Sequence, residues 1–299
     1  MRGQDIVRLV ALAAIWGASF IFLRALAPVL GPVVTATSRV VIAGVALVGY
    51  FRIIGFDANL RRYWRELAIV GLVNSALPFL LFAFAAVHIP ASYSVILNTA
   101  TPLFAAIRAT LWLDEPMTAW RAAGLAGGAA GVALVTGAGP VAPDAMFGWA
   151  IAACLCAALC YALAGIYIKR HASGAKPMAI AGWSQVFAGA ALLPLTPFAP
   201  VHGTVTLGVL ANVLGLALLC SAVAYLLYYR LIVDVGPTRA MTVTFLMPLF
   251  GMVWSVIFLD ETVTLPMIAG CALIVGGTAL VFRHPGRATV VTGGAPRKT

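Results

Sequence analysis

Long runs without ionisable side chains are the feature that most limits how this chain can fold. Only nine acidic and 19 basic residues are spread over its 299 positions. Charged residues make up 9% of the chain and hydrophobic residues 63%, whereas about a quarter of an average soluble domain is charged. The sequence therefore predicts an all-α, polytopic membrane protein rather than a soluble domain.

Ten apolar segments approach the roughly 20 residues that a helix needs to cross ~30 Å of hydrocarbon. The first is longer than the apolar core of a signal peptide, so we expect a retained helix. The tail at 285–299 is polar and rich in Gly, Pro and Arg, and we expect it to be disordered and cytoplasmic. The ten predicted transmembrane helices are 6–27, 32–52, 66–87, 91–113, 118–137, 147–169, 177–198, 206–233, 237–259 and 264–283.

Lysine and arginine are concentrated in alternate connections, which predicts the orientation in the membrane. The connection at 52–65 holds four arginines and that at 169–176 holds three basic residues. The connections on the other side hold no Lys or Arg; they are 88–90, 138–146, 199–205 and 260–263. We therefore expect both termini to be cytoplasmic. The net charge of +10 then reflects topology and not a nucleic-acid partner.

The chain repeats itself at an offset of 146 residues. "TPLFAAIRATLWLDEP" at 101–116 returns as "MPLFGMVWSVIFLDET" at 247–262, and an offset of 145 pairs Arg39 with Ser184. Two five-helix units, 1–140 and 141–284, follow from this register. Because five is odd, the second unit must be inserted in the opposite sense, which is the architecture of alternating-access carriers. Other matched pairs are Ser75 with Ser221, Gly124 with Gly270, and Gly131 with Gly277.

Three motifs carry a resemblance to a known family. They are "IWGASFIFLRAL" (Ile15–Leu26), "SRVVIAG" (Ser38–Gly44) and the twin Pro-Leu-Phe…Asp-Glu…Gly-x6-Gly blocks. With these, nearly the whole chain resembles the drug/metabolite transporter superfamily of EamA type. The resemblance implies a ten-helix carrier that moves small metabolites outward across a bacterial inner membrane. The chain looks most similar to the YddG-like aromatic amino acid exporters.

Prolines inside apolar segments predict where the solute pathway lies. Pro102 and Pro248 should kink their helices and free the carbonyls of Asn98 and Thr244, which must then face protein or a water-filled cavity. Ser94, Asn98 and Thr101 are spaced to share one polar helix face. The alternative is that these prolines only bend the helices for packing. We predict Pro78, Pro102 and Pro248 as helix-kink or gating positions.

Arg39 and a set of aromatic residues complete the predicted substrate site. Arg39 lies inside the second predicted helix, where it either binds a substrate carboxylate or caps backbone carbonyls. Aromatic faces would stack on planar rings or attract organic cations, although an aromatic belt at the membrane interface is the competing interpretation. The predicted substrate-binding residues are Trp16, Arg39, Phe79, Ser94, Asn98, Thr101, Tyr161, Trp183, Gln185, Tyr225 and Thr244.

The Asp-Glu pairs that close the two blocks, Asp114-Glu115 and Asp260-Glu261, precede a helix start. We expect them to complement the dipole of the helix that follows, with a proton or cation site as the alternative. No Asp or Glu lies deep in a predicted span, which favours facilitated diffusion, or coupling that uses no buried carboxylate.

Other functional classes find less support in the sequence. The five cysteines contain no Cys-x-x-Cys pair, and we expect no metal or cofactor. An enzyme would need a nucleophile with its base, or a metal cluster, and the sequence suggests neither. The prediction is a monomeric exporter of small metabolites, with aromatic amino acids favoured and aromatic cations included. Export of threonine, homoserine or cysteine-type solutes, or a channel, remains as the alternative.

Overall fold

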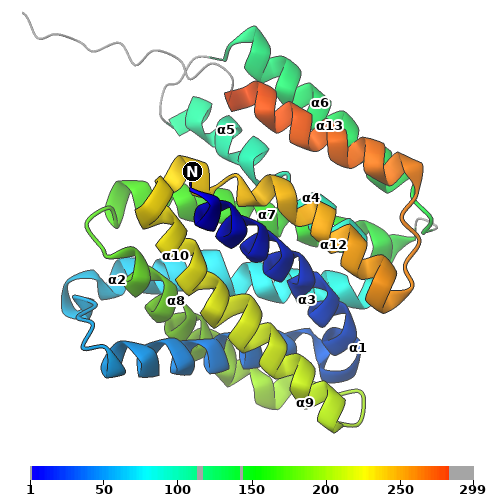
Figure 1. Ribbon diagram of the computed structural model, residues 1–299. Coiled ribbons are helices and arrows are strands. Elements are labelled where there is room, and N and C mark those ends of the chain that lie inside the picture. Colours follow the sequence, from blue (N-terminus) through cyan, green and yellow to red (C-terminus); the bar gives the residue numbers. More distant parts are fainter. Residues whose placement is uncertain (1, 113–116, 142–143, 283–299) are drawn as a thin grey trace, which may run out of the picture.

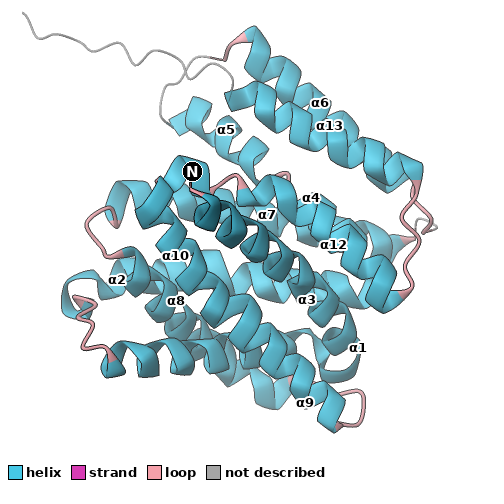
Figure 2. Cartoon of the chain, in the orientation of Figure 1, coloured by secondary structure: helices cyan, strands magenta, loops and turns pink. Residues whose placement is uncertain are grey.

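The computed structural model describes residues 2–112, 117–141 and 144–282, and all regular structure in these ranges is helical (Figures 1 and 2). Within the same ranges, six helical stretches are long and apolar enough to cross a membrane. The elements are α1 (Gly3–Ile53), α2 (Leu60–Gly71), η1 (Leu72–Ala76), α3 (Leu77–His88), α4 (Ala91–Asn98), α5 (Thr101–Trp112), α6 (Ala119–Gly137), α7 (Ala145–His171), α8 (Pro177–Leu192), η2 (Leu193–Phe198), α9 (Leu207–Leu214), η3 (Gly215–Val223), α10 (Ala224–Val235), α11 (Pro237–Ala240), α12 (Val243–Leu259) and α13 (Leu265–Phe282).

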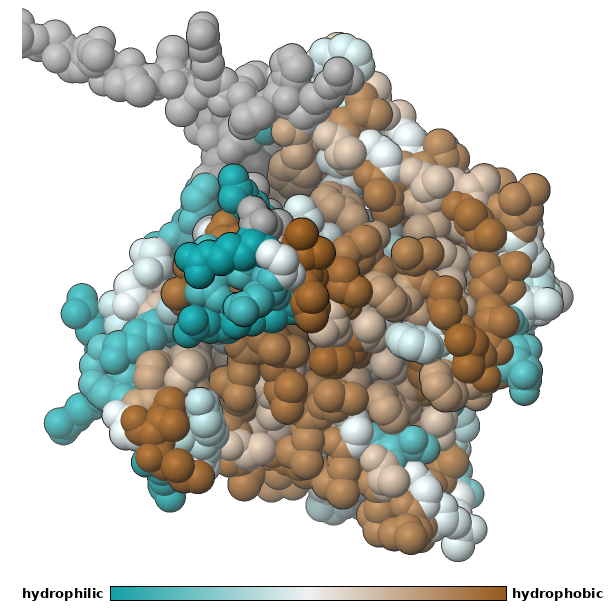
Figure 3. All heavy atoms as spheres, in the orientation of Figure 1, coloured by the Kyte–Doolittle hydropathy of each residue, from teal (hydrophilic) through white to brown (hydrophobic). Residues whose placement is uncertain are grey.

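Bulky apolar side chains cover the outside of the molecule. Phe198, Ile53 and Leu207 are 86%, 84% and 83% exposed. Figure 3 shows apolar residues over much of the visible face, with a hydrophilic group on the side where the N-terminus and α2 lie. An apolar surface of this extent is not stable in water. The protein is therefore a multi-pass membrane protein whose exposed apolar side chains contact lipid.

The first two predicted spans, 6–27 and 32–52, lie in one 51-residue helix, α1, that is broken at Gly31. Gly31 has φ 75° and ψ 159°, a conformation that L-residues with a side chain rarely adopt. A Cβ at this position would also lie 2.8 Å from the carbonyl oxygen of Pro200. Position 31 thus requires glycine for two reasons, its backbone conformation and the lack of space for a Cβ. The chain changes direction at this break (Figure 1).

Two π-helical segments, η1 and η3, widen a helical turn in the middle of the molecule. Ser75 lies in η1 and Ser221 lies in η3, 146 residues later. In η1 the N–H of Leu77 bonds to the carbonyl of Leu72, five residues back, just before Pro78, which has no N–H to donate. The position 146 residues after Pro78 is Ala224, so η3 forms without a proline.

The predicted kinks at Pro102 and Pro248 need correction. The chain breaks at Thr99–Ala100, so Pro102 is the second residue of α5 and not the middle of one long helix. The freed carbonyl of Asn98 accepts a hydrogen bond from Thr101 Oγ1 at 2.8 Å. Pro248 lies inside α12 without ending it, and the break near it falls earlier, at Met241–Thr242.

Glycines bring α6 and α13 into backbone contact. A Cβ on Gly124 would lie 2.5 Å from the carbonyl oxygen of Gly277, and one on Gly131 would lie 2.6 Å from that of Gly270. The Gly-x6-Gly spacing of each helix therefore meets the same spacing of the other. In Figure 1 the two helices lie side by side at one edge of the molecule.

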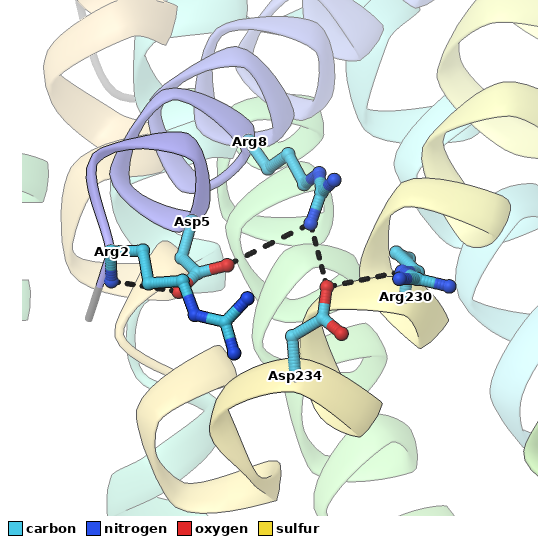
Figure 4. Close-up of polar contacts among 5 residues, drawn as sticks. All are labelled: Arg2, Asp5, Arg8, Arg230 and Asp234. Atoms are coloured by element: carbon cyan, nitrogen blue, oxygen red, sulfur yellow. Dashed lines mark hydrogen bonds and ion pairs between the residues drawn. The ribbon is translucent and has the colours of Figure 1, made fainter.

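Polar contacts join segments that the charge pattern placed on one face of the membrane. Arg8 Nη1 lies 2.6 Å from Asp234 Oδ2 and 3.7 Å from Asp5 Oδ1 (Figure 4). Arg230 Nε lies 3.1 Å from the same Asp234 oxygen. This cluster holds the start of α1 against the end of α10.

Two further contacts follow the same division into faces. Lys176 Nζ donates to the carbonyl of Asp57 at 2.7 Å, joining two of the basic connections. In the connection 199–205, which we predict to lie at the opposite face, the N–H groups of His202 and Gly203 donate to the carbonyl of Val29 at 2.9 and 3.0 Å.

Candidate functional site

A cavity of about 350 Å³ lies between helices from both halves of the sequence. Ligand pockets that bury most of a small organic molecule begin at about this size. Both runs of α1 contribute to it, together with η1, α3, α4, α5, α7, α8, α10 and α12. The lining residues are Trp16, Ser19, Phe20, Leu23, Arg39, Asn74, Phe79, Phe82, Asn98, Thr101, Tyr161, Gly165, Ile168, Ile180, Ser184, Tyr225, Tyr228, Tyr229, Met241, Thr244 and Met247.

The structure brings eight of the eleven predicted substrate-binding residues to this cavity. These eight are Trp16, Arg39, Phe79, Asn98, Thr101, Tyr161, Tyr225 and Thr244. The three predicted prolines are not part of the lining. Pro78 follows η1, which contains the lining residue Asn74, and Pro102 follows the break at Thr99–Ala100, just after the lining residue Asn98.

Three predicted site residues lie outside the cavity lining. Ser94 is buried and accepts a hydrogen bond from Cys154 Sγ at 3.6 Å, so it faces α7. Gln185 is fully buried and donates to Ser75 Oγ at 3.1 Å. Trp183 packs against Phe187, with ring centroids 6.5 Å apart.

Eight of the 21 residues that line the cavity are aromatic. Trp16 packs against Tyr228 at 5.1 Å and Tyr225 at 6.3 Å between centroids, and Tyr225 stacks on Tyr229 at 6.2 Å. On the other side, Tyr161 stacks on Phe82 at 6.2 Å. Rings at these separations attract one another and give a wall suited to a planar apolar group.

Arg39 carries the charge of the cavity. Its Nε donates to Ser221 Oγ at 2.9 Å, and its guanidinium carbon lies 3.7 Å from the centroid of the Phe79 ring. Arg39 is 6% exposed. Among the described residues that line the cavity, it alone is charged. Since burial of an unpaired charge is costly, a charge held here needs a functional or structural reason.

Sequence reasoning missed several polar residues of the lining, above all Ser19 and Asn74. An amide side chain in an otherwise apolar span was a usable signal for Asn74, as it was for Asn98. The Oδ1 atom of Asn98 is buried and has no hydrogen-bond partner among the described residues. Such an acceptor is available to a solute or to water.

The prediction that the closing carboxylates complement the helix that follows them is wrong for Glu261. Glu261 does not cap α13, the helix that follows it. Its carboxylate accepts hydrogen bonds from the N–H of Ala91 at 2.7 Å and from the N–H and Oγ of Ser92 at 3.0 and 2.8 Å, at the start of α4. The Asp114-Glu115 pair lies outside the described residues.

The described residues contain no group of three or more His, Cys, Asp or Glu that could hold a metal ion.

Comparison with known proteins identifies the family. The EamA-like transporter family matches residues 6–137 and, a second time, residues 148–283. This chain is an EamA-family transporter. The double match places one family unit in each part of the sequence that carries a Pro-Leu-Phe block. The aromatic cavity described above therefore belongs to a transporter that moves a small molecule across a membrane.

Individual relatives of this EamA-family transporter are distant but cover it almost fully. "Uncharacterized transporter YvbV" of Bacillus subtilis is 26% identical over 90% of this chain and 88% of its own length. A "Probable terminal-alkyne amino-acid exporter" of Streptantibioticus cattleyicolor is 26% identical over 92% of both chains. One solved crystal structure superposes with a TM-score of 0.66 at 17% identity, covering 95% of this chain and 98% of that chain, which shows a shared fold.

Proposed function

We propose that this EamA-family transporter exports amino acids by alternating access, with aromatic amino acids favoured. In this proposal, ten transmembrane helices form two inverted five-helix repeats, 1–140 and 141–284, in a bacterial inner membrane. Both termini and the tail at 285–299 are cytoplasmic, and a monomer is sufficient because the two repeats are fused. The observation that carries the proposal is a cavity lined by residues of both repeats. They include aromatic rings and one guanidinium, that of Arg39.

The chemistry of the lining supports an amphipathic solute. The rings of Trp16, Tyr161 and Tyr225 offer faces for a planar side chain, and Arg39, Asn98 and Thr101 offer polar groups beside them. A relative named as an amino-acid exporter supports the same substrate class. The resemblance to aromatic amino acid exporters agrees with the aromatic wall.

The position of the cavity favours alternating access over a channel. Ile168, Tyr229 and Met241 of the lining lie near the helix ends that we assign to the cytoplasm. Toward the other face, Glu261 is bonded to the start of α4. A central site lined by residues of both repeats, with polar contacts that close one end of the molecule, fits one state of such a carrier.

Transport by the purified protein in liposomes, measured across a panel of amino acids, tests the proposal. We expect saturable transport of phenylalanine, tyrosine or tryptophan, with competition among them and weaker transport of threonine and cysteine. Equal transport of all five would remove the aromatic preference. Flux that does not saturate would support a channel instead.

A further inference from the structure

We propose that Arg39 binds the carboxylate of the transported solute, and that its charge makes the carrier select carboxylate-bearing solutes over neutral or cationic analogues with the same ring. This inference rests on the proposed transport function and names the solute group that the cavity recognises. It also removes aromatic cations from the expected substrates.

Arg39 keeps most of its hydrogen-bonding capacity free for a solute. A guanidinium has five N–H donors in a planar fork. In the described structure one of them is used, from Nε to Ser221 Oγ at 2.9 Å. The Phe79 ring covers one face of the guanidinium at 3.7 Å. Ser221 and Phe79 together fix the plane of the fork, while the residue lines the cavity.

The second part of the chain shows that the contact with serine does not need a charge. Gln185 donates to Ser75 Oγ at 3.1 Å, and Ser75 lies 146 residues before Ser221. Gln185 is adjacent to Ser184, the residue that an offset of 145 pairs with Arg39. In each case a side chain bonds the serine of a π-helical segment. Only the side chain that lines the cavity, Arg39, is charged.

The contact with Ser221 therefore does not explain why residue 39 is charged, and the charge needs another partner. Among the described lining residues there is no Asp or Glu that could neutralise it. A cation in a membrane interior is stabilised when it pairs with an anion, and a carboxylate matches a guanidinium fork with two parallel hydrogen bonds. The solute supplies that anion when it binds. An organic cation would instead meet a like charge in a confined space.

The rest of the lining suits the remainder of such a solute. The buried Oδ1 atom of Asn98 is an acceptor without a partner in the described structure, which fits an ammonium or amide N–H. The aromatic wall of Tyr161, Tyr225 and Trp16 fits the side chain. No second cation lies among the described lining residues, so the cavity matches one carboxylate per solute.

The experiment compares wild-type protein with Arg39→Gln in liposomes, using phenylalanine, its amide and its alcohol as solutes. Arg39→Gln keeps a donor for Ser221, as Gln185 does for Ser75, and removes only the charge and the fork. We expect wild type to bind phenylalanine roughly 10- to 100-fold more tightly than the other two. In Arg39→Gln we expect that preference to fall below about threefold, because phenylalanine loses affinity while the two cationic analogues lose none.

Two further variants keep the test decisive. Arg39→Lys retains the charge without the fork and should keep an intermediate preference, even if Arg39→Gln fails to fold. Arg24→Gln removes another α1 guanidinium, one that bonds the carbonyls of Ala86 and Val87 and does not line the cavity, so the solute preference should match wild type. An unchanged preference in folded Arg39→Gln would overturn the role of Arg39 and leave the transport function standing. Wild-type transport of the amide and alcohol without transport of any amino acid would overturn both proposals.

Discussion

Glu261 caps a helix that begins 170 residues before it. Its Oε1 atom accepts the N–H of Ala91, and its Oε2 atom accepts both the N–H and the hydroxyl of Ser92. The first N–H groups of a helix have no partner within the helix, and a carboxylate there also meets the positive end of the helix dipole. One side chain from the connection between α12 and α13 thus holds the start of α4.

Removing this cap should destabilise the protein. We expect Glu261→Gln to lower the free energy of unfolding by about 1–2 kcal/mol, because the amide keeps the size of the side chain but loses the charge-assisted hydrogen bonds. Thermal melting in detergent measures the effect. Asp260→Asn is the matched control: Asp260 has φ 52°, which Asn tolerates, so its melting temperature should stay near that of wild type. Equal losses in both variants would argue against the cap.

The close approach of α6 and α13 should make their contact glycines intolerant of a single methyl group. Gly124→Ala places its Cβ 2.5 Å from the carbonyl oxygen of Gly277, and we expect a loss of about 1–3 kcal/mol. Gly127→Ala and Gly276→Ala are the controls, because a Cβ at either position meets nothing within 4 Å. These two should be neutral or stabilising by up to ~1 kcal/mol, since alanine favours helix. The melting temperatures would contradict this packing if all three variants behaved alike.

The predicted orientation can be tested with single cysteines in a background free of the five native ones. Arg61→Cys and His202→Cys lie in connections that we assign to opposite faces. A reagent that cannot cross the inner membrane should label His202→Cys in spheroplasts, and Arg61→Cys only after lysis. Labelling of both from the same side would rule out the inverted arrangement.

Two neighbouring polar residues should differ in their effect on transport. Asn98 lines the cavity with an unpartnered Oδ1 atom, so we expect Asn98→Ala to lower transport by roughly tenfold. Ser94 faces Cys154 on α7, so Ser94→Ala should retain a KM close to that of wild type. The readout is the initial rate against solute concentration at matched protein levels in the membrane. A larger loss in Ser94→Ala would mean that the pathway follows the other side of α4.

The contrast between Ser94 and Asn98 also shows where prediction from sequence stops. Spacings of four and three residues put Ser94, Asn98 and Thr101 on one face only if the helix is continuous. Ser94 and Asn98 lie in the same helix, α4, yet Ser94 bonds Cys154 on α7 while Asn98 lines the cavity. Thr101 also lines it, but it follows the break at Thr99–Ala100, so the continuous helix assumed for all three residues does not exist. Apolar length was enough to predict a membrane protein, and polar and aromatic residues inside the spans predicted eight of the 21 residues that line its cavity.

Contacts between residues far apart in the sequence could not be predicted from rules that consider only neighbouring residues. The preference of a carboxylate for a helix start is correct for Glu261, but the rule considers only the helix next in sequence, and the true partner is α4. Likewise, the glycine spacing in α6 and α13 was visible as a repeat, whereas the contact of one copy with the other depends on how the helices pack. Such partners are fixed by the tertiary fold and leave no mark in a single sequence.

The difference between Arg39 and its counterparts Ser184 and Gln185 has a consequence for how such a carrier arises. An assembly of two identical five-helix polypeptides would bring two guanidiniums into the same small chamber, where they would repel one another. Covalent fusion frees each copy to change alone, so one can keep the cation while the other turns neutral. A lone positive charge between two related halves thus needs copies that differ in sequence, and a duplication inside one polypeptide provides them.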